Sequence, residues 1–131
     1  MDLGPFLRIA SLEDMFYLVY LMSDRDYLGS FEHIVLLGLL RLSDDAYGVT
    51  VRKEIESRTG REVSIGAIYA TLARLEAKGY VKSHLSDPTP ERGGRSKRFF
   101  RVTANGIAEV NRSHRAIRRM SQGLDVVRSH A

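Results

Sequence analysis

A change of hydrophobic period just after Gly79 constrains the fold more than any other feature of this sequence. Before it, apolar residues recur three and four positions apart, which is the spacing of one buried helix face. That stripe is formed by Ile65, Ile68, Leu72 and Leu75. After it, residues 80–85 and 97–102 are short runs of β-forming residues, separated by the prolines and paired glycines of residues 87–96. The sequence therefore predicts a helix that leads directly into a two-stranded β-hairpin.

Two more helices are predicted before this unit. Residues 31–42 are apolar nearly all round, as in a buried helix. Residues 43–45 then provide a turn and an N-cap for a second helix over residues 46–58, which ends at Gly60. Ser64 is a good N-cap for the third helix, because its hydroxyl can accept a hydrogen bond from the first helical turn.

The predicted order is helix, helix, capped helix, basic-tipped hairpin and long helix, which is typical of a winged helix-turn-helix. We therefore expect a mainly α fold with a two-stranded β-hairpin and a long C-terminal dimerisation helix. Residues 1–30 are expected to form an N-terminal arm, residues 31–103 the DNA-binding domain and residues 104–131 the dimerisation helix. Residues 1–21 are either an unusual arm or an artefact upstream of a native start at Met22, and the sequence leaves both explanations open.

Composition and motifs exclude several classes of function. The chain has no cysteine, which excludes disulfides and thiolate-bound zinc and fits the reducing cytoplasm, where we expect the protein to act. Its four histidines lack metal-ligand spacing, and no phosphate-binding glycine loop or nucleophile motif occurs. The longest apolar runs are well short of the ~20 residues that span a bilayer. We therefore expect no enzyme, metal, cofactor or membrane segment.

The charge of the chain is concentrated in its middle. Residues 1–51 contain three basic and eight acidic residues, residues 52–101 contain twelve and six, and residues 102–131 contain five and two. A basic middle after an acidic start suggests a polyanion that meets one part of the fold. Solvated helix faces are the alternative explanation, and the arrangement of the charges has to decide between them.

The exposed face of the third predicted helix suits a major groove, because small residues let the backbone approach base edges and basic residues can reach phosphates. The candidate DNA-binding residues here are Ser64, Gly66, Ala67, Tyr69, Ala70, Thr71, Arg74 and Lys78. Tyr69 either contacts DNA or supports the helix as a half-buried side chain. Arg74 either contacts DNA or forms a surface ion pair with Glu76 or another neighbour.

The hairpin tip is a second basic element, and its glycines let it follow a DNA backbone or enter a minor groove. Its candidate DNA-binding residues are Arg92, Arg95, Lys97 and Arg98. Two basic elements on one face would supply the salt-dependent affinity that is typical of nucleic-acid binding.

The last helix is predicted to begin at Thr103 as its N-cap and to run to about Val127. Its apolar positions alternate at four- and three-residue spacing, as in a coiled-coil seam. The candidate dimerisation residues are Val110, Ile117, Met120, Leu124 and Val127. Packing within one chain is the alternative, but a helix of this length overhangs so small a domain, so we expect a homodimer.

Several segments, taken in order, resemble the PadR family of bacterial transcriptional regulators. They are Leu36-Leu37-Gly38-Leu39-Leu40, Ala46-Tyr47-Gly48, residues 64–79, Gly93-Gly94-Arg95-Ser96 with residues 97–100, and Val102-Thr103-Ala104-Asn105-Gly106. The resemblance covers residues 34–106. Ala70 stands where the family often has proline and Phe100 where it usually has tyrosine, so no hydroxyl contact carries over to Phe100.

The resemblance implies a homodimeric repressor on double-stranded DNA at a pseudo-palindromic operator, often relieved by a small aromatic or amphipathic effector. It also implies that the last helix packs on its partner and on the first helix. The alternative is a winged-helix module that binds a small molecule or a protein without specific affinity for DNA. Such a module is expected to have an acidic or apolar third-helix face and a neutral hairpin tip. The basic tip of this chain argues against it, while Ala67 and Ala70 offer few polar groups for base readout and leave it open.

Overall fold

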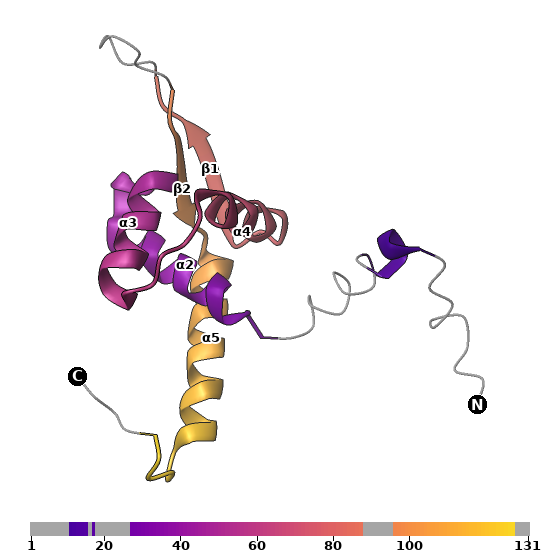
Figure 1. The fold of residues 1–131 in the computed structure, drawn as a ribbon, viewed down its shortest axis with the longest axis vertical. Coiled ribbons are helices and arrows are strands. Elements are labelled where there is room, and N and C mark those ends of the chain that lie inside the picture. The colour runs from indigo at the N-terminus through magenta and orange to yellow at the C-terminus, as the bar shows by residue number, and fades with distance from the viewer. Residues whose placement is uncertain (1–10, 16, 18–26, 88–95, 128–131) are drawn as a thin grey trace.

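A computed structural model of the chain describes residues 11–15, 17, 27–87 and 96–127 (Figure 1). Its elements are α2 (Ser30–Leu42), the short 3-10 helix η2 (Ser43–Asp45), α3 (Gly48–Thr59), α4 (Ile65–Ala77), β1 (Val81–Leu85), β2 (Arg98–Val102) and α5 (Ala104–Ser121). The predicted fold class is confirmed: the molecule is mainly helical, with one two-stranded antiparallel hairpin. No helix in the described part of the chain is long and apolar enough to cross a membrane.

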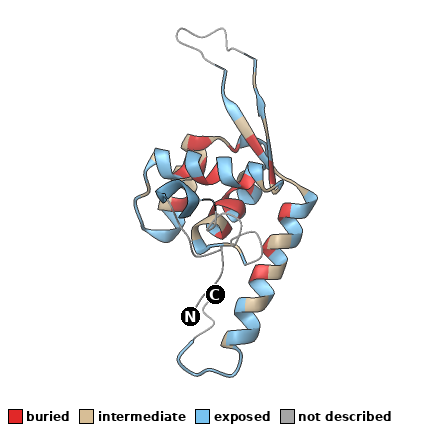
Figure 2. Ribbon diagram, turned by 90° about the vertical axis from the view of Figure 1, so that its right-hand side faces the viewer, coloured by how far each residue is buried: buried red, intermediate tan, exposed pale blue. Residues whose placement is uncertain are grey.

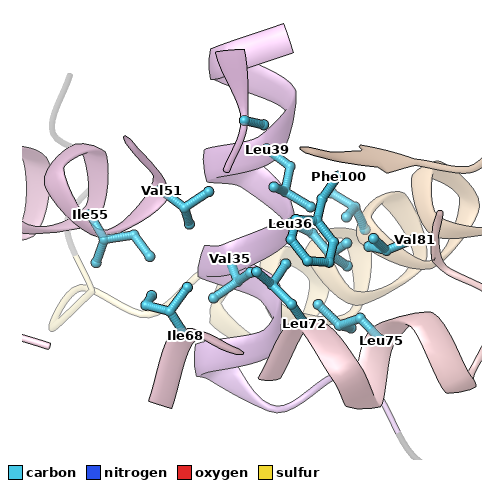
Figure 3. Packing of buried hydrophobic residues seen from close by; sticks show 12 residues of the cluster. Val35, Leu36, Leu39, Val51, Ile55, Ile68, Leu72, Leu75, Val81 and Phe100 are labelled. Atoms are coloured by element: carbon cyan, nitrogen blue, oxygen red, sulfur yellow. The ribbon is translucent and has the colours of Figure 1, made fainter. Parts of the chain in front are cut away.

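Helix α2 forms the centre of the hydrophobic core. Val35 and Leu36 are fully buried, and α3, α4, α5 and β2 all pack against this helix. Figure 3 shows labelled side chains of α3, α4, β1 and β2 packed around those of α2. The buried apolar cluster consists of Val35, Leu36, Leu39, Ala46, Val51, Ile55, Ile68, Leu72, Leu75, Val81, Phe100 and Val110. Helix α2 is not buried all round as predicted, because Ile34, Leu37 and Leu40 on its outer side are exposed.

The hairpin extends from this core in one direction and α5 in the opposite direction (Figure 1). Val81 pairs with Val102 at the root of the hairpin, and Leu85 pairs with Arg98 toward its tip. A third segment joins at the root, because the Phe100 amide donates a hydrogen bond to the Ala46 carbonyl at 2.9 Å. This bond fixes the hairpin to the segment that precedes α3.

The same bond explains a correction to the predicted second helix. Residues 46 and 47 are extended as they pair with β2, so α3 begins at Gly48 and not at residue 46. Asp44 and Asp45 belong to η2 and do not cap α3. The N-cap residue is Tyr47, whose amide donates to the Thr50 hydroxyl at 3.0 Å.

Helix α5 is attached to the core by its first half only. A Cβ atom at Gly106 would overlap the carbonyl oxygen of Tyr80, so glycine is required where the helix crosses the hairpin root. Val110 and Ser113 are buried farther along (Figure 2). The helix ends at Ser121 and not near residue 127, because the chain turns at Gly123, where φ is +83°.

A short part of the N-terminal arm packs on this attached half of α5. The Leu28 amide donates to the Ser113 hydroxyl at 3.2 Å. The Arg112 guanidinium lies 4.5 Å from the centre of the Tyr27 ring. Residues 12–15 and 17 of the arm are helical.

Candidate nucleic-acid interface

Helix α4 is held as the sequence predicts, with one face in the core and one in solvent. The Ser64 hydroxyl accepts a hydrogen bond from the Ala67 amide at 3.0 Å, which confirms the N-cap. The buried face contains Ile68, Leu72 and Leu75. The outermost positions, four, three and four residues apart, are all small and exposed: Gly66, Ala70, Ala73 and Ala77. A face this thin allows the helix backbone to approach another surface closely.

Thr71 does not lie on the exposed face, contrary to the prediction. Its side chain is turned toward the core and the residue is only 2% exposed. The predicted face was drawn too wide, because Thr71 lies next to the buried Leu75 on the helix circumference. Its hydroxyl accepts a hydrogen bond from Nη2 of Arg74 at 3.1 Å. Thr71 therefore orients the exposed Arg74, while Arg74 forms no ion pair with Glu76 among the pairs of the described chain.

Lys78 is also less available than the prediction assumed. Its ammonium lies 3.1 Å from the Glu32 carboxylate, and the two side chains are 9% and 12% exposed. This pair joins the end of α4 to the start of α2. A lysine buried in an ion pair is a structural residue, because releasing it would leave a buried carboxylate without its partner.

Tyr69 supports the start of α3, as one of its two predicted roles requires. Its ring lies against the start of α3, where a Cβ atom at Gly48 would overlap the ring and its hydroxyl. The residue nevertheless remains 45% exposed. Gly48 of the Ala46-Tyr47-Gly48 segment is thus explained by the close approach of a side chain from α4.

A hollow of about 460 Å³ lies between α4 and the hairpin, and we call it the notch. It is lined by Tyr69, Ala73, Glu76, Ala77, Ser83, Arg98 and Phe100. Arg98 donates from Nη1 to the Ser83 hydroxyl at 3.0 Å, which steadies the guanidinium across the hairpin. The notch therefore presents a phenol, a hydroxyl and a guanidinium from two elements, all of which can donate hydrogen bonds to phosphate oxygens.

Lys97 belongs to a different cluster, beside Tyr47 of the segment that precedes α3. Its ammonium lies 4.5 Å from the centre of the Tyr47 ring and 3.5 Å from the Tyr47 hydroxyl. Phe99 packs edge-on against Tyr47, and His84 stacks on Phe99. The other two hairpin candidates, Arg92 and Arg95, lie outside the described residues.

Two cations of the hairpin were missed by the sequence analysis. Lys82 and Arg101 are directly paired across the two strands, and both are exposed. Like charges in such a position destabilise a sheet unless an anion lies nearby. Their alternation with Val81 and Phe100 is the period-two signal that would have identified them.

The predicted apolar seam of the last helix is divided by the structure. Val110 is a core residue with 7% exposure and is not available to a partner, because α5 crosses α2 there. Ile117 and Met120 are 62% and 80% exposed. They line a groove of about 480 Å³ with Tyr27, Leu28, Ser113, Ala116, Ser121 and Leu124. Val127 lies past the turn and lines a different hollow, so it does not continue the seam.

No group of three or more histidine, aspartate or glutamate residues that could hold a metal ion occurs among the described residues. One histidine is nevertheless unusual. His33 on α2 is buried, and its pKa is lowered, first by the loss of hydration and then by the positive charge that His114 can carry. It is a neutral residue of the joint between α2 and α5.

A capped, exposed helix beside a cationic hairpin, both resting on one helical core, defines a class of protein: the chain is a winged helix-turn-helix transcriptional regulator and not an enzyme. More specifically, it belongs to the PadR-like family of transcriptional regulators, whose profile matches residues 36–112, more than half of the chain. The resemblance found in the sequence is confirmed by this match.

Individual relatives agree with this family. The chain is 32% identical over 87 residues to the transcriptional regulator Rv3488 of Mycobacterium tuberculosis. This match covers 66% of this chain and 77% of that protein. A PadR family transcription regulator of Clostridium difficile is similar in structure, with a TM-score of 0.61 and 22% identity over 74% of this chain and 97% of that chain. A PadR family regulator of Eggerthella lenta gives a TM-score of 0.60 and 20% identity over 86% and 90%. These two structures share the fold.

Proposed function

We propose that the chain binds double-stranded DNA sequence-specifically, with α4 in a major groove and the hairpin along the adjacent backbone. The observation that carries this proposal is the notch, in which Tyr69 of α4 and Arg98 of the hairpin line the same hollow. Arg74, exposed and oriented by Thr71, adds a cation to the exposed side of α4. Ser64, Gly66, Ala67 and Ala70 are the remaining candidate contacts on α4, and Lys97, Arg92 and Arg95 those on the hairpin.

The same proposal includes a homodimer on a pseudo-palindromic operator whose half-sites lie about one helical turn, ~34 Å, apart. The apolar groove on α5 supports it, because Ile117, Met120 and Leu124 are large, exposed and adjacent. Residues 1–30, 31–103 and 104–131 then act as arm, DNA-binding domain and dimerisation segment. Family membership supports a repressor in the cytoplasm, relieved by a small aromatic or amphipathic effector.

One observation favours a second candidate, a winged-helix module that binds a protein or a small molecule without specific affinity for DNA. The outermost face of α4 carries only glycine and alanine, which offer no side-chain hydrogen bonds to base edges. Base-specific contacts would then come only from the flanks of the helix. The two candidates differ in whether the affinity of the protein for a DNA duplex depends on the duplex sequence.

Fluorescence anisotropy with a labelled duplex from the region upstream of the chain's own gene, against a scrambled duplex, separates them. We expect tighter binding to the native duplex and a steep loss of affinity with salt. An Arg98→Ala variant should bind both duplexes more weakly, with a salt slope smaller by about 0.9. The matched control is Arg58→Ala, since Arg58 pairs with Glu54 on α3 away from the notch. Equal, weak binding to both duplexes would favour the second candidate.

A further inference from the structure

The end of α5 carries a second hollow, far from the notch and on the opposite side of the core from the hairpin (Figure 1). The chain turns at Gly123, and the Leu124 amide donates back to the Ser121 carbonyl at 3.1 Å. The turn places the following residues beside the last helical turns. The hollow encloses about 680 Å³ and is lined by Arg115, Arg118, Arg119, Ser121, Gln122, Gly123, Leu124, Asp125 and Val127.

The positive charge in this hollow has no ion-pair partner among the residues that the structure describes. Arg115, Arg118 and Arg119 are all exposed, and none of them forms an ion pair within the described part of the chain. Arg112 on the same helix shows the contrast, because its Nε lies 2.9 Å from the Glu109 carboxylate. Among the described residues that line the hollow, Asp125 is the single carboxylate, against three guanidinium groups.

Helix stability alone does not explain this concentration of arginine. Cations in the last turn are favourable next to the helix carbonyls, which accounts for Arg118 and Arg119. Arg115 lies earlier, and its spacing of three and four residues from the other two brings like charges together, which destabilises a helix. An anion bound between these side chains would remove that repulsion.

The hollow also has an apolar wall. Leu124 and Val127 are 51% and 53% exposed, and they line the hollow together with the arginines. Guanidinium groups bind carboxylate, sulfonate and phosphate oxygens through paired hydrogen bonds, while leucine and valine favour an apolar surface. A ligand that fits this hollow therefore combines an acidic group with an apolar surface.

We propose that the end of α5 is a binding site for a small amphipathic anion, whose acidic group lies between Arg115, Arg118 and Arg119 and whose apolar body lies on Leu124 and Val127. The site is separate from the notch and does not depend on the proposed binding of DNA; it adjoins the apolar groove of the proposed homodimer, with which it shares Leu124. It supplies a place for a regulatory ligand at the end of α5 that points away from the hairpin (Figure 1).

The test uses two fluorescent probes with the same ring system. Anilinonaphthalene sulfonate carries an acidic group, and phenylnaphthylamine lacks it. Titration of the full chain should give saturable binding of the sulfonate. A variant with Arg118→Gln and Arg119→Gln should weaken this binding about tenfold or more, because two charge-assisted contacts are lost. Its affinity for phenylnaphthylamine should stay the same.

The matched control is Lys82→Gln with Arg101→Gln, which removes the same charge from the hairpin and should leave both affinities unchanged. A second variant, Asp125→Asn, keeps every arginine and should tighten sulfonate binding by removing the carboxylate. It also keeps the test decisive if the double arginine variant does not fold, which circular dichroism reports. Equal sulfonate affinity in the arginine variant and the native chain, or no response to Asp125→Asn when that variant stands alone, would overturn the proposal.

Discussion

Helices α4 and α5 both carry basic residues near their C-terminal ends, yet the two ends differ in how those residues are used. At the end of α4, Lys78 is neutralised by Glu32, and Arg74 is held by Thr71. At the end of α5, Arg118 and Arg119 have no ion-pair partner in the described chain. The first end is tied to α2 by the Lys78–Glu32 pair, and the second projects away from the core (Figure 1).

This difference shows that a basic residue on a helix can be proposed as a ligand contact only once its ion-pair partners within the protein are known. Lys78 resembles a phosphate contact in sequence because it follows Arg74 by one helical turn. The partner that removes it from the surface lies 46 positions earlier in the chain. No local sequence pattern predicts a contact between residues this far apart in the chain.

The largest expected effect comes from breaking the enclosed pair. Lys78→Met should lower the free energy of unfolding by about 3 kcal/mol, because it leaves the Glu32 carboxylate buried and unpaired. Urea denaturation followed by circular dichroism measures this. Lys53→Met is the control, since Lys53 is exposed on α3 and should change stability by less than about 0.5 kcal/mol. Similar losses for both variants would mean that the Lys78 pair is effectively solvated.

A somewhat smaller loss is expected where α5 joins the core. Gly106→Ala should lower the free energy of unfolding by about 2 kcal/mol, because the new Cβ atom meets the Tyr80 carbonyl and forces the hairpin root to move. Gly66→Ala on α4 has open space and should instead stabilise the helix by up to about 1 kcal/mol. Thermal denaturation of the two variants measures both changes in stability. An unchanged stability of Gly106→Ala would contradict the close crossing of α5 and the hairpin root.

A third effect concerns DNA and the hydrogen bond within α4. Arg74→Ala should weaken duplex binding about tenfold and reduce the salt slope by about 0.9, because one phosphate contact is lost. Thr71→Val should weaken it less, because the guanidinium remains but is no longer oriented. A double-mutant cycle by fluorescence anisotropy tests this dependence. Full additivity of the two changes would show that Thr71 acts independently of Arg74.

The smallest effect is a pH dependence at the joint between α2 and α5. Because burial lowers the pKa of His33 in the folded chain, the folded state resists its protonation. Stability should therefore decrease as the pH falls below about 6.5, the ordinary value of the side chain. His33→Gln should flatten the stability profile between pH 7 and 5.5. An unaltered profile in His33→Gln would contradict this role of His33.

Much of the fold was determined by the sequence alone, because its signals are local. The cap at Ser64, the stripe from Ile68 to Leu75 and the strands that flank the hairpin tip follow from side-chain spacing and turn chemistry. The family resemblance followed as well, since its motifs are short and lie in order along the chain. Candidates such as Tyr69 and Arg98 were found because they belong to these local elements.

Only the tertiary structure decided which candidates face solvent and which face the protein. In the structure Thr71 and Val110 are buried, and Lys78 forms an ion pair with α2. The chain turns at Gly123, so Val127 lines a hollow together with arginines. The physical reason is that burial and ion pairing depend on residues far away in sequence. A period of three or four residues describes one helix, whereas the energy of each side chain depends on what the other elements bring against it.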